Sequence, residues 1–242
     1  MDRVAYSYEP IAFGYDAAAW LYSLGRIGHS KRVHLDSIRP GDRVLYVGVG
    51  GGRDAIAAAQ RGASVSALDL SPRMLDRTAR AARQAAVEIE LLCEEATTHS
   101  PGRPYDMVCA HYFLNLFEAS QASLVLQGLA EHVRPGGILS LADFAPAEEG
   151  RIARFLTAAY YRPVNVLAWA LGFCALHPIP DYPAMLEGAG LEVLSIDRMP
   201  LRPTGQVGYW SVMGKSRENA GCDPLEKPDS ELANFGREVG IR

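Results

Sequence analysis

Short apolar segments alternate with amphipathic segments between residues 42 and 143. The apolar segments are rich in valine, isoleucine and leucine, which is typical of strands buried in a parallel sheet. Each is separated from the next by residues with helical periodicity. We therefore predict five central strands, at residues 44–47, 65–70, 87–91, 107–110 and 138–142.

The segments between these strands have the ends expected of helices. Residues 53–61 are closed by Gly62, a residue that commonly ends helices. A later helix opens at Ser71 and Pro72, because serine can cap a helix and proline suits its first turn. The sequence Pro135-Gly136-Gly137 is expected to end another helix. Alternating strands and helices predict a doubly wound α/β sheet.

The pattern changes after Asp143. A long apolar and aromatic segment runs to His177. It is followed by a short helical segment at 182–187 and by two strand-like segments at 191–199 and 207–214, which could pair antiparallel.

The chain of 242 residues is long enough for one sizeable core and does not require two. We predict one domain over residues 1–215, with a cap at about 148–180. Residues 216–242 are polar and lack an apolar period, so we expect a flexible tail.

Composition and charge indicate which partners the protein is expected to bind, and the first residues indicate its compartment. Hydrophobic residues make up 48% and charged residues 21% of the chain, as in ordinary globular proteins. The net charge of −4, without a cluster of lysine or arginine, argues against nucleic acid as a partner. The first ten residues lack the pattern of a secretory signal, so we expect a cytoplasmic protein.

Neither a metal site nor a membrane span is expected. The cysteines contain no CxxC pair, which argues against zinc and against a disulfide framework. The longest apolar run, 166–176, is too short to cross a bilayer of about 30 Å.

A glycine-rich turn at 47–54, with the sequence VGVGGGRD, lies where a strand meets a helix. Only glycine lets a backbone turn this tightly beneath a ligand, and the helix N-terminus that follows favours a carboxylate. Such turns serve many nucleotides. The G-x-G-x-x-A spacing from Gly50 to Ala55 also fits a dinucleotide fingerprint.

Two further acids lie at strand ends. Asp69 ends the second predicted strand, where α/β nucleotide sites place a carboxylate that accepts from ribose hydroxyls; it could instead cap the next helix. Glu95 and Ala96 follow the third predicted strand, and the Glu95 carboxylate could accept from an adenine amino group or remain a solvated loop acid.

Taken in order, VLYVGVGGGRDA, VSALDLSPRML, EEA, YDMV and RPGG resemble the motif series of class I S-adenosylmethionine (AdoMet) methyltransferases. The resemblance covers roughly residues 15–215. Tyr15-Asp16 and the sequence SLGR at 23–26 are similar to the N-terminal segment of ubiquinone and menaquinone C-methyltransferases.

The resemblance implies a Rossmann-like seven-stranded sheet with an antiparallel last strand, a helical N-terminal segment and a helical cap after the fifth strand. It also implies AdoMet as the cofactor. By position it assigns Gly48, Gly50 and Gly52 to the methionine end, Asp69 to the ribose, Leu70 and Met74 to the adenine face, Glu95 and Ala96 to the adenine edge, and His111 and Tyr112 to the surroundings of the methyl group.

The chain departs from this family at Tyr46, where the family usually carries an acid that helps to hold the amino group of the cofactor. Asp54 or Tyr15 could compensate. The N-P-P-Y motif of amide and adenine N-methyltransferases is replaced by HYFL at 111–114, which argues against those acceptors.

Methyl transfer from AdoMet requires mainly in-line placement of the acceptor, and a base only for acceptors that lose a proton. His111 and, second, His177 are the candidate bases, because histidine titrates near neutral pH. A polar contact to the cofactor or backbone would also account for His111, and a helix end for His177.

The aromatic segment 155–176 falls where the family inserts a substrate cap, which implies a hydrophobic acceptor such as a quinone, polyketide or lipid. The same segment could be plain core, a homodimer face or a peripheral membrane contact. We therefore predict a methyltransferase of hydrophobic small molecules. A repurposed AdoMet-fold protein and an NAD(P)-dependent reductase are the alternatives.

Overall fold

Seven strands form one mixed sheet, in the order β3-β2-β1-β4-β5-β7-β6. The computed structural model describes residues 25–146, 150–170, 179–200 and 207–217. Strands β1 to β5 pair in parallel, whereas β7 is antiparallel to both β5 and β6. The strands are β1 (Arg43–Val47), β2 (Ser64–Leu68), β3 (Glu90–Leu92), β4 (Tyr105–His111), β5 (Val133–Phe144), β6 (Leu191–Pro200) and β7 (Val207–Ser216).

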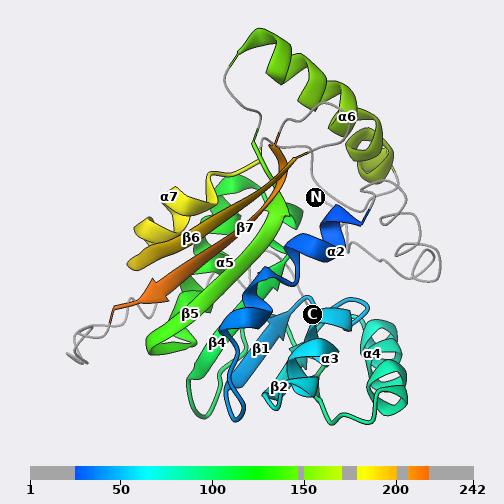
Figure 1. Ribbon diagram of the computed structural model, residues 1–242, viewed down its shortest axis with the longest axis vertical. Helices are drawn as coiled ribbons and strands as arrows, with labels where there is room; N and C mark the ends of the chain where they lie inside the picture. The colour runs from blue at the N-terminus through cyan, green and yellow to red at the C-terminus, as the bar shows by residue number, and fades with distance from the viewer. Residues whose placement is uncertain (1–24, 147–149, 171–178, 201–206, 218–242) are drawn as a thin grey trace.

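Helices cover both faces of the sheet, as predicted for a doubly wound fold (Figure 1). Alternate residues of β1 divide between the two faces: Val44 and Tyr46 pack toward α3, α4 and η1, and Leu45 and Val47 pack toward α5 and α7. The helical elements are α2 (Arg26–Ser30), η1 (Val33–Ser37), α3 (Arg53–Gln60), α4 (Pro72–Gln84), η2 (Leu114–Leu116), α5 (Ala119–Glu131), α6 (Arg151–Ala170) and α7 (Tyr182–Gly188).

The described parts of the N-terminal segment and of the segment after β5 are helical, as predicted. Helices α2 and η1 lie over the sheet, and α6 stands beyond the ends of β5 and β7 (Figure 1). Tyr15 and His177 lie outside the described residues, as do residues 218–242 of the tail predicted at 216–242.

The predicted end of the helix before β5 is wrong. The Pro135-Gly136-Gly137 sequence does not end a helix, because α5 already ends at Glu131 and these residues lie inside β5. The pairing of β5 with β4 shifts register there: Tyr105 pairs with Val133, but Met107 pairs with Ile138. The three residues form an irregularity in the strand, where proline and the left-handed Gly136 (φ 74°) are tolerated.

The Ser71 cap is confirmed. Its hydroxyl accepts from the Met74 backbone N–H at 3.4 Å, and Pro72 occupies the first helical position of α4. Strand β2 ends at Leu68, earlier than predicted, so Asp69 and Leu70 lie just beyond it. This places both residues at the carboxyl edge of the sheet, beside the glycine-rich turn.

Candidate functional site

The glycine-rich turn connects β1 to α3 in a conformation that requires glycine. Gly48, Gly50 and Gly52 have φ of 63°, 55° and 70°, in the left-handed region that L-residues seldom adopt. A Cβ at Gly48 would lie 2.6 Å from the Phe113 ring, and one at Gly52 would lie 2.7 Å from Thr78. A Cβ at Gly50 would meet nothing closer than 3.9 Å, so the backbone there has open space beside it.

Asp69 joins this turn to the start of α4. Its Oδ2 accepts from the Gly50 N–H at 3.1 Å, and its Oδ1 accepts from the Ser71 N–H at 2.9 Å. Burial raises the pKa of the Asp69 carboxyl, and the two backbone hydrogen bonds oppose that rise. Each carboxylate oxygen has a second lone pair, so Asp69 can brace the turn and still accept from a ligand hydroxyl.

The residues predicted to surround an adenine gather next to Asp69. Leu70 is 63% exposed, an unusual position for a leucine, whereas Met74, in the first turn of α4, is buried. The backbone of Asp69 donates to Leu92 O at 3.1 Å, which brings the segment after β3, with Glu95 and Ala96, to the same edge. Leu70, Met74 and the segment with Glu95 and Ala96 thus follow the ends of β2 and β3 at one edge of the sheet.

Beneath the turn, the face of the sheet that packs against α3 carries a cluster of buried polar side chains. Tyr46, Cys109 and Ser140 pair across β1, β4 and β5, so their side chains form one row on a buried surface. His111 lies at the end of β4 and adds a fourth polar group. Its Nδ1 is 3.0 Å from Asp54 Oδ2, and its Nε2 is 3.2 Å from Ser140 Oγ.

His34, from η1, completes this network. Its Nε2 lies 2.6 Å from the Tyr46 hydroxyl, and its ring centroid lies 4.7 Å from that of His111. Tyr46 therefore directs its hydroxyl to a histidine of the N-terminal segment. His34 and Ser140 were not predicted as site residues, because neither belongs to a local motif.

Charges in the network are set by burial and by the Asp54–His111 contact. Burial lowers the pKa of His34 to about 3, and the neighbouring His111 lowers it further. Burial also lowers the pKa of His111, against the opposing effect of Asp54. Burial alone would raise the pKa of Asp54, but Lys31 and His111 outweigh it and hold the pKa well below its usual range. The network therefore contains a carboxylate and neutral imidazoles.

His34, Cys109 and His111 also bring metal-ligand atoms within 4.8 Å of one another. However, both ring nitrogens of His111 and the Nε2 of His34 already have hydrogen-bond partners. Burial raises the pKa of the Cys109 thiol well above its usual value, which keeps it protonated. The geometry is that of a hydrogen-bonded network.

These buried histidines predict acid sensitivity. Unfolded histidine has its ordinary pKa of 6.5 and binds a proton as the pH falls toward 5.5, whereas folded His34, with a pKa of about 3, stays neutral. The free energy of unfolding therefore falls as the pH drops from 7 toward 3. Between pH 7 and 5.5 we expect His34 alone to lower the free energy of unfolding by ~1.3 kcal/mol, and His111 to add to it. Urea unfolding at the two pH values measures this loss.

Two variants test the assignment of this pH dependence. His34→Asn should show a smaller loss between pH 7 and 5.5, whereas replacement of the exposed His29 by asparagine should leave the wild-type loss intact. An unchanged pH dependence in His34→Asn would contradict the account.

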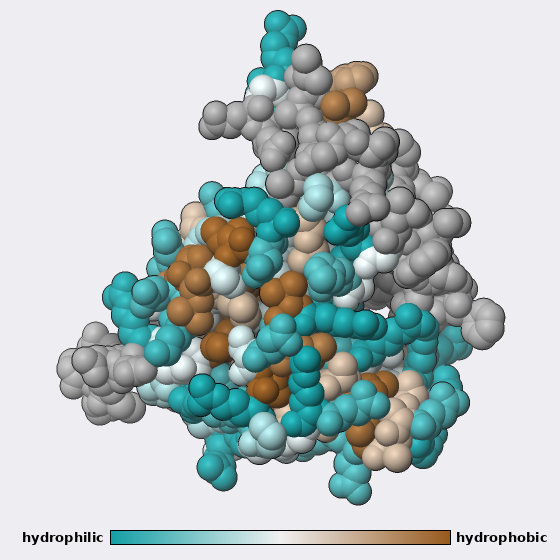
Figure 2. Space-filling view, viewed as in Figure 1, coloured by the Kyte–Doolittle hydropathy of each residue, from teal (hydrophilic) through white to brown (hydrophobic). Residues whose placement is uncertain are grey.

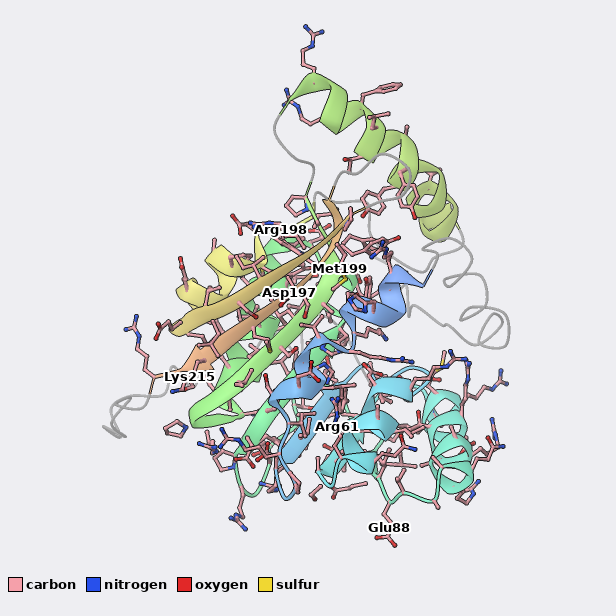
Figure 3. All side chains as sticks on the ribbon, viewed as in Figure 1. Arg61, Glu88, Asp197, Arg198, Met199 and Lys215 are labelled. Carbon is pink, nitrogen blue, oxygen red and sulfur yellow. The ribbon has the colours of Figure 1, made fainter. Side chains whose placement is uncertain are left out.

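An aromatic cluster lies beyond the polar network, between β5, β7 and α6. Met199 and Tyr209 are buried at its centre, and Met199 is labelled at the end of β6 in Figure 3. Tyr112 follows His111 with a left-handed φ of 54°, and its ring meets Phe144 edge-on at 5.4 Å. Such a backbone conformation is rare for tyrosine and concentrates at functional sites.

The hydroxyl groups of this cluster bond within the protein. Tyr112 pairs with Ser30 Oγ at 2.9 Å, Tyr160 pairs with Tyr209 at 3.0 Å, and Tyr161 donates to the Gly208 carbonyl. The cluster therefore combines aromatic rings with hydroxyls that are already hydrogen-bonded.

Comparisons with known proteins find methyltransferases. The model of a family described as "Methyltransferase domain" matches residues 44–137, from β1 into β5. The matched region holds the glycine turn, Asp69 and His111, within the seven-stranded sheet described above. Over this region, which is less than half of its length, the chain resembles the class I methyltransferase family.

The relatives of this chain have varied names. It is 29% identical over 161 residues to an uncharacterized methyltransferase of Synechocystis, covering 62% of this chain and 67% of that one. It is 28% identical to a demethylmenaquinone methyltransferase of Renibacterium salmoninarum, covering 69% of each. It is 36% identical over 104 residues to the tRNA 5-carboxymethoxyuridine methyltransferase of Escherichia coli, covering 41% of this chain but only 39% of that one.

Solved methyltransferases share the fold. The N-methyltransferase NodS of Bradyrhizobium japonicum, in complex with S-adenosylhomocysteine (SAH), superposes with a TM-score of 0.60 at 14% identity, covering 81% of this chain and 87% of that one. Magnesium protoporphyrin IX methyltransferase of Synechocystis, with bound SAH, gives 0.57 at 20% identity, covering 85% and 83%. These matches confirm the predicted fold class.

Proposed function

We propose that this methyltransferase uses AdoMet and methylates a hydrophobic small molecule. The cofactor follows from the family and is consistent with the two SAH-bound neighbours. The proposed location of the cofactor rests on the hydrogen bond from the Gly50 N–H to Asp69. This bond holds the predicted ribose-binding carboxylate against the glycine turn at one edge of the sheet.

The residues at this edge suit the parts of the cofactor. Open space beside Gly50 accommodates the methionine end, and Asp69 can accept from the ribose hydroxyls. The exposed Leu70, with Met74 behind it, offers an apolar face to the adenine, and Glu95 with Ala96 lies at its edge. Tyr15, outside the described residues, remains a predicted contact.

Bound AdoMet would supply an activated methyl group and its own leaving group. The protein's part is to place the acceptor in line with that methyl group and to exclude water. Because both ring nitrogens of His111 are hydrogen-bonded inside the protein, the geometry favours a positioning role for His111 over its predicted role as a base. A base at His177 stays a prediction.

The hydrophobic acceptor is supported by the aromatic cluster beside Tyr112. The hydroxyls of Tyr112, Tyr160 and Tyr161 form hydrogen bonds to protein atoms. A ligand in this region would therefore contact mainly the apolar faces and edges of aromatic rings. A quinone, a polyketide or a lipid with an aromatic head would suit such surfaces. The demethylmenaquinone enzyme among the relatives is consistent with such an acceptor.

Helix α6 is the segment that carries the predicted membrane or homodimer contact. Phe155 is 71% exposed and Val166 is 49% exposed, and Figure 2 shows apolar surface on this helix. Among the described residues, no helix is long and apolar enough to cross a membrane. Both contacts stay predictions.

Label transfer tests the proposed activity. With methyl-labelled AdoMet and cell extract, we expect the protein to transfer label to an organic-soluble product, because the acceptor is apolar. Asp69→Ala should lose this transfer, whereas replacement of the exposed Asp76 on α4 by alanine should retain it.

Label that appears only in RNA or protein would contradict the proposed acceptor class. Tight binding of SAH without transfer to any fraction would favour the repurposed AdoMet-fold protein instead.

A further inference from the structure

Asp54 and His111 form a pair that water scarcely reaches. The carboxylate belongs to the first turn of α3 and is 6% exposed, and the imidazole ends β4 and is 4% exposed. Their contact is 3.0 Å long. Burying the Asp54 carboxylate carries a desolvation cost, so the pair is poor evidence of a purely stabilising role.

The hydrogen bonds around His111 fix the ring from both sides. A carboxylate can only accept, so Nδ1 carries the proton that is donated to Asp54. Nε2 is then an acceptor, and the Ser140 hydroxyl 3.2 Å away is its donor. One tautomer and one ring orientation satisfy both contacts, as they do in carboxylate–histidine pairs that orient a functional group.

The pair connects the two ends of the glycine turn. Asp54 follows Gly52 by two residues at the start of α3. Phe113 follows His111 by two residues, and its ring packs so closely on Gly48 that a Cβ there would lie 2.6 Å away. A shift of β4 relative to α3 would therefore displace both ends of the turn: Gly48 through its contact with Phe113, and Gly52 through its neighbour Asp54.

We propose that Asp54 and His111 are positioning residues for the cofactor: their hydrogen bond holds the end of β4 against the start of α3 and so sets the shape of the glycine turn. This inference rests on the proposed function. It assigns the pair no contact with the reacting atoms.

Pairs of substitutions at each position test whether the hydrogen bond matters or the residue type does, because one variant of each pair keeps the bond and the other removes it. Asp54→Asn keeps an acceptor and Asp54→Ala removes it. His111→Asn places an amide N–H near the position of Nδ1, whereas His111→Gln reaches toward Ser140. We expect Asp54→Ala and His111→Gln to weaken SAH binding about tenfold or more, the loss of one buried hydrogen bond. The two asparagine variants should keep affinity within about threefold of wild type.

Calorimetric titration with SAH, beside urea unfolding of each variant, measures both effects. The double variant Asp54→Ala/His111→Gln should bind no worse than either single variant, because both remove the same interaction. Leu129→Ala, in the core on the opposite face of the sheet, is the control: it should lose stability and keep its SAH affinity.

The outcomes are distinguishable. If wild-type protein does not bind SAH, the proposed function fails. If wild type binds and folded Asp54→Ala or His111→Gln binds equally well, only this inference fails. The inference is also overturned if the two asparagine variants lose as much SAH affinity as Asp54→Ala and His111→Gln. A stoichiometric metal on His34, Cys109 and His111 in the purified protein would overturn it as well, because the metal would occupy nitrogens that these hydrogen bonds use.

Discussion

Gly52→Ala is expected to abolish measurable cofactor binding at ordinary concentrations. Gly52 has a left-handed φ of 70°, and a Cβ there would lie 2.7 Å from both Cγ2 and Oγ1 of Thr78. Left-handed strain costs about 1–2 kcal/mol in an L-residue, and overpacking adds about 1–3 kcal/mol. We expect the free energy of unfolding to fall by about 2–5 kcal/mol.

The effect on binding should exceed the effect on folding. Thr78 Oγ1 donates to Gly50 O at 3.2 Å, so a methyl group at Gly52 displaces the side chain that supports the centre of the turn. A displacement of about 1 Å in a site can cost about 100-fold in function, and we expect SAH affinity to fall by about that factor or more.

Gly62→Ala is the matched control for this variant. Gly62 has a left-handed φ of 88° and its Cβ would lie 3.2 Å from Pro40, but it follows the other end of α3, near Arg61 in Figure 3. It should lose stability and keep SAH affinity within about twofold. Equal losses of affinity in Gly52→Ala and Gly62→Ala would show that the turn has no special role in binding.

Asp69→Ala is expected to weaken SAH binding by ~1–3 kcal/mol, or about 5- to 150-fold, through lost hydrogen bonds to the ribose. The variant also leaves the N–H groups of Gly50 and Ser71 without their carboxylate partner, so part of the loss acts through the turn. Calorimetry with SAH measures the change.

Asp76→Ala, on the exposed side of α4, controls for the removal of one negative charge near this edge of the sheet. The two variants change net charge equally. If both weakened SAH binding to the same extent, the loss would be a general electrostatic effect and Asp69 would not be a ribose ligand.

The parts of the site that follow one another along the chain were predictable from sequence. Gly48 to Gly52, Asp69 and the Ser71 cap each belong to a short segment in which spacing reflects backbone geometry. The antiparallel pairing of β6 and β7 was also predictable, because two apolar segments close the domain.

The buried network was not predictable, because its members meet only in three dimensions. His34, Asp54 and Ser140 are far apart in sequence, and their association depends on the register of β1, β4 and β5. The resemblance to class I methyltransferases placed His111 near the methyl group, but sequence could not show that both of its ring nitrogens have partners in the protein. The bulge at Pro135-Gly136-Gly137 was missed because the same residues also favour turns.

The central claim is that AdoMet binds this chain at the glycine turn, and titration of the purified protein with SAH, beside NADH and NADPH, tests it most directly. The account predicts saturable binding of one SAH per chain, with no heat of binding from either dinucleotide. Binding of a dinucleotide in place of SAH would contradict the account and favour a reductase.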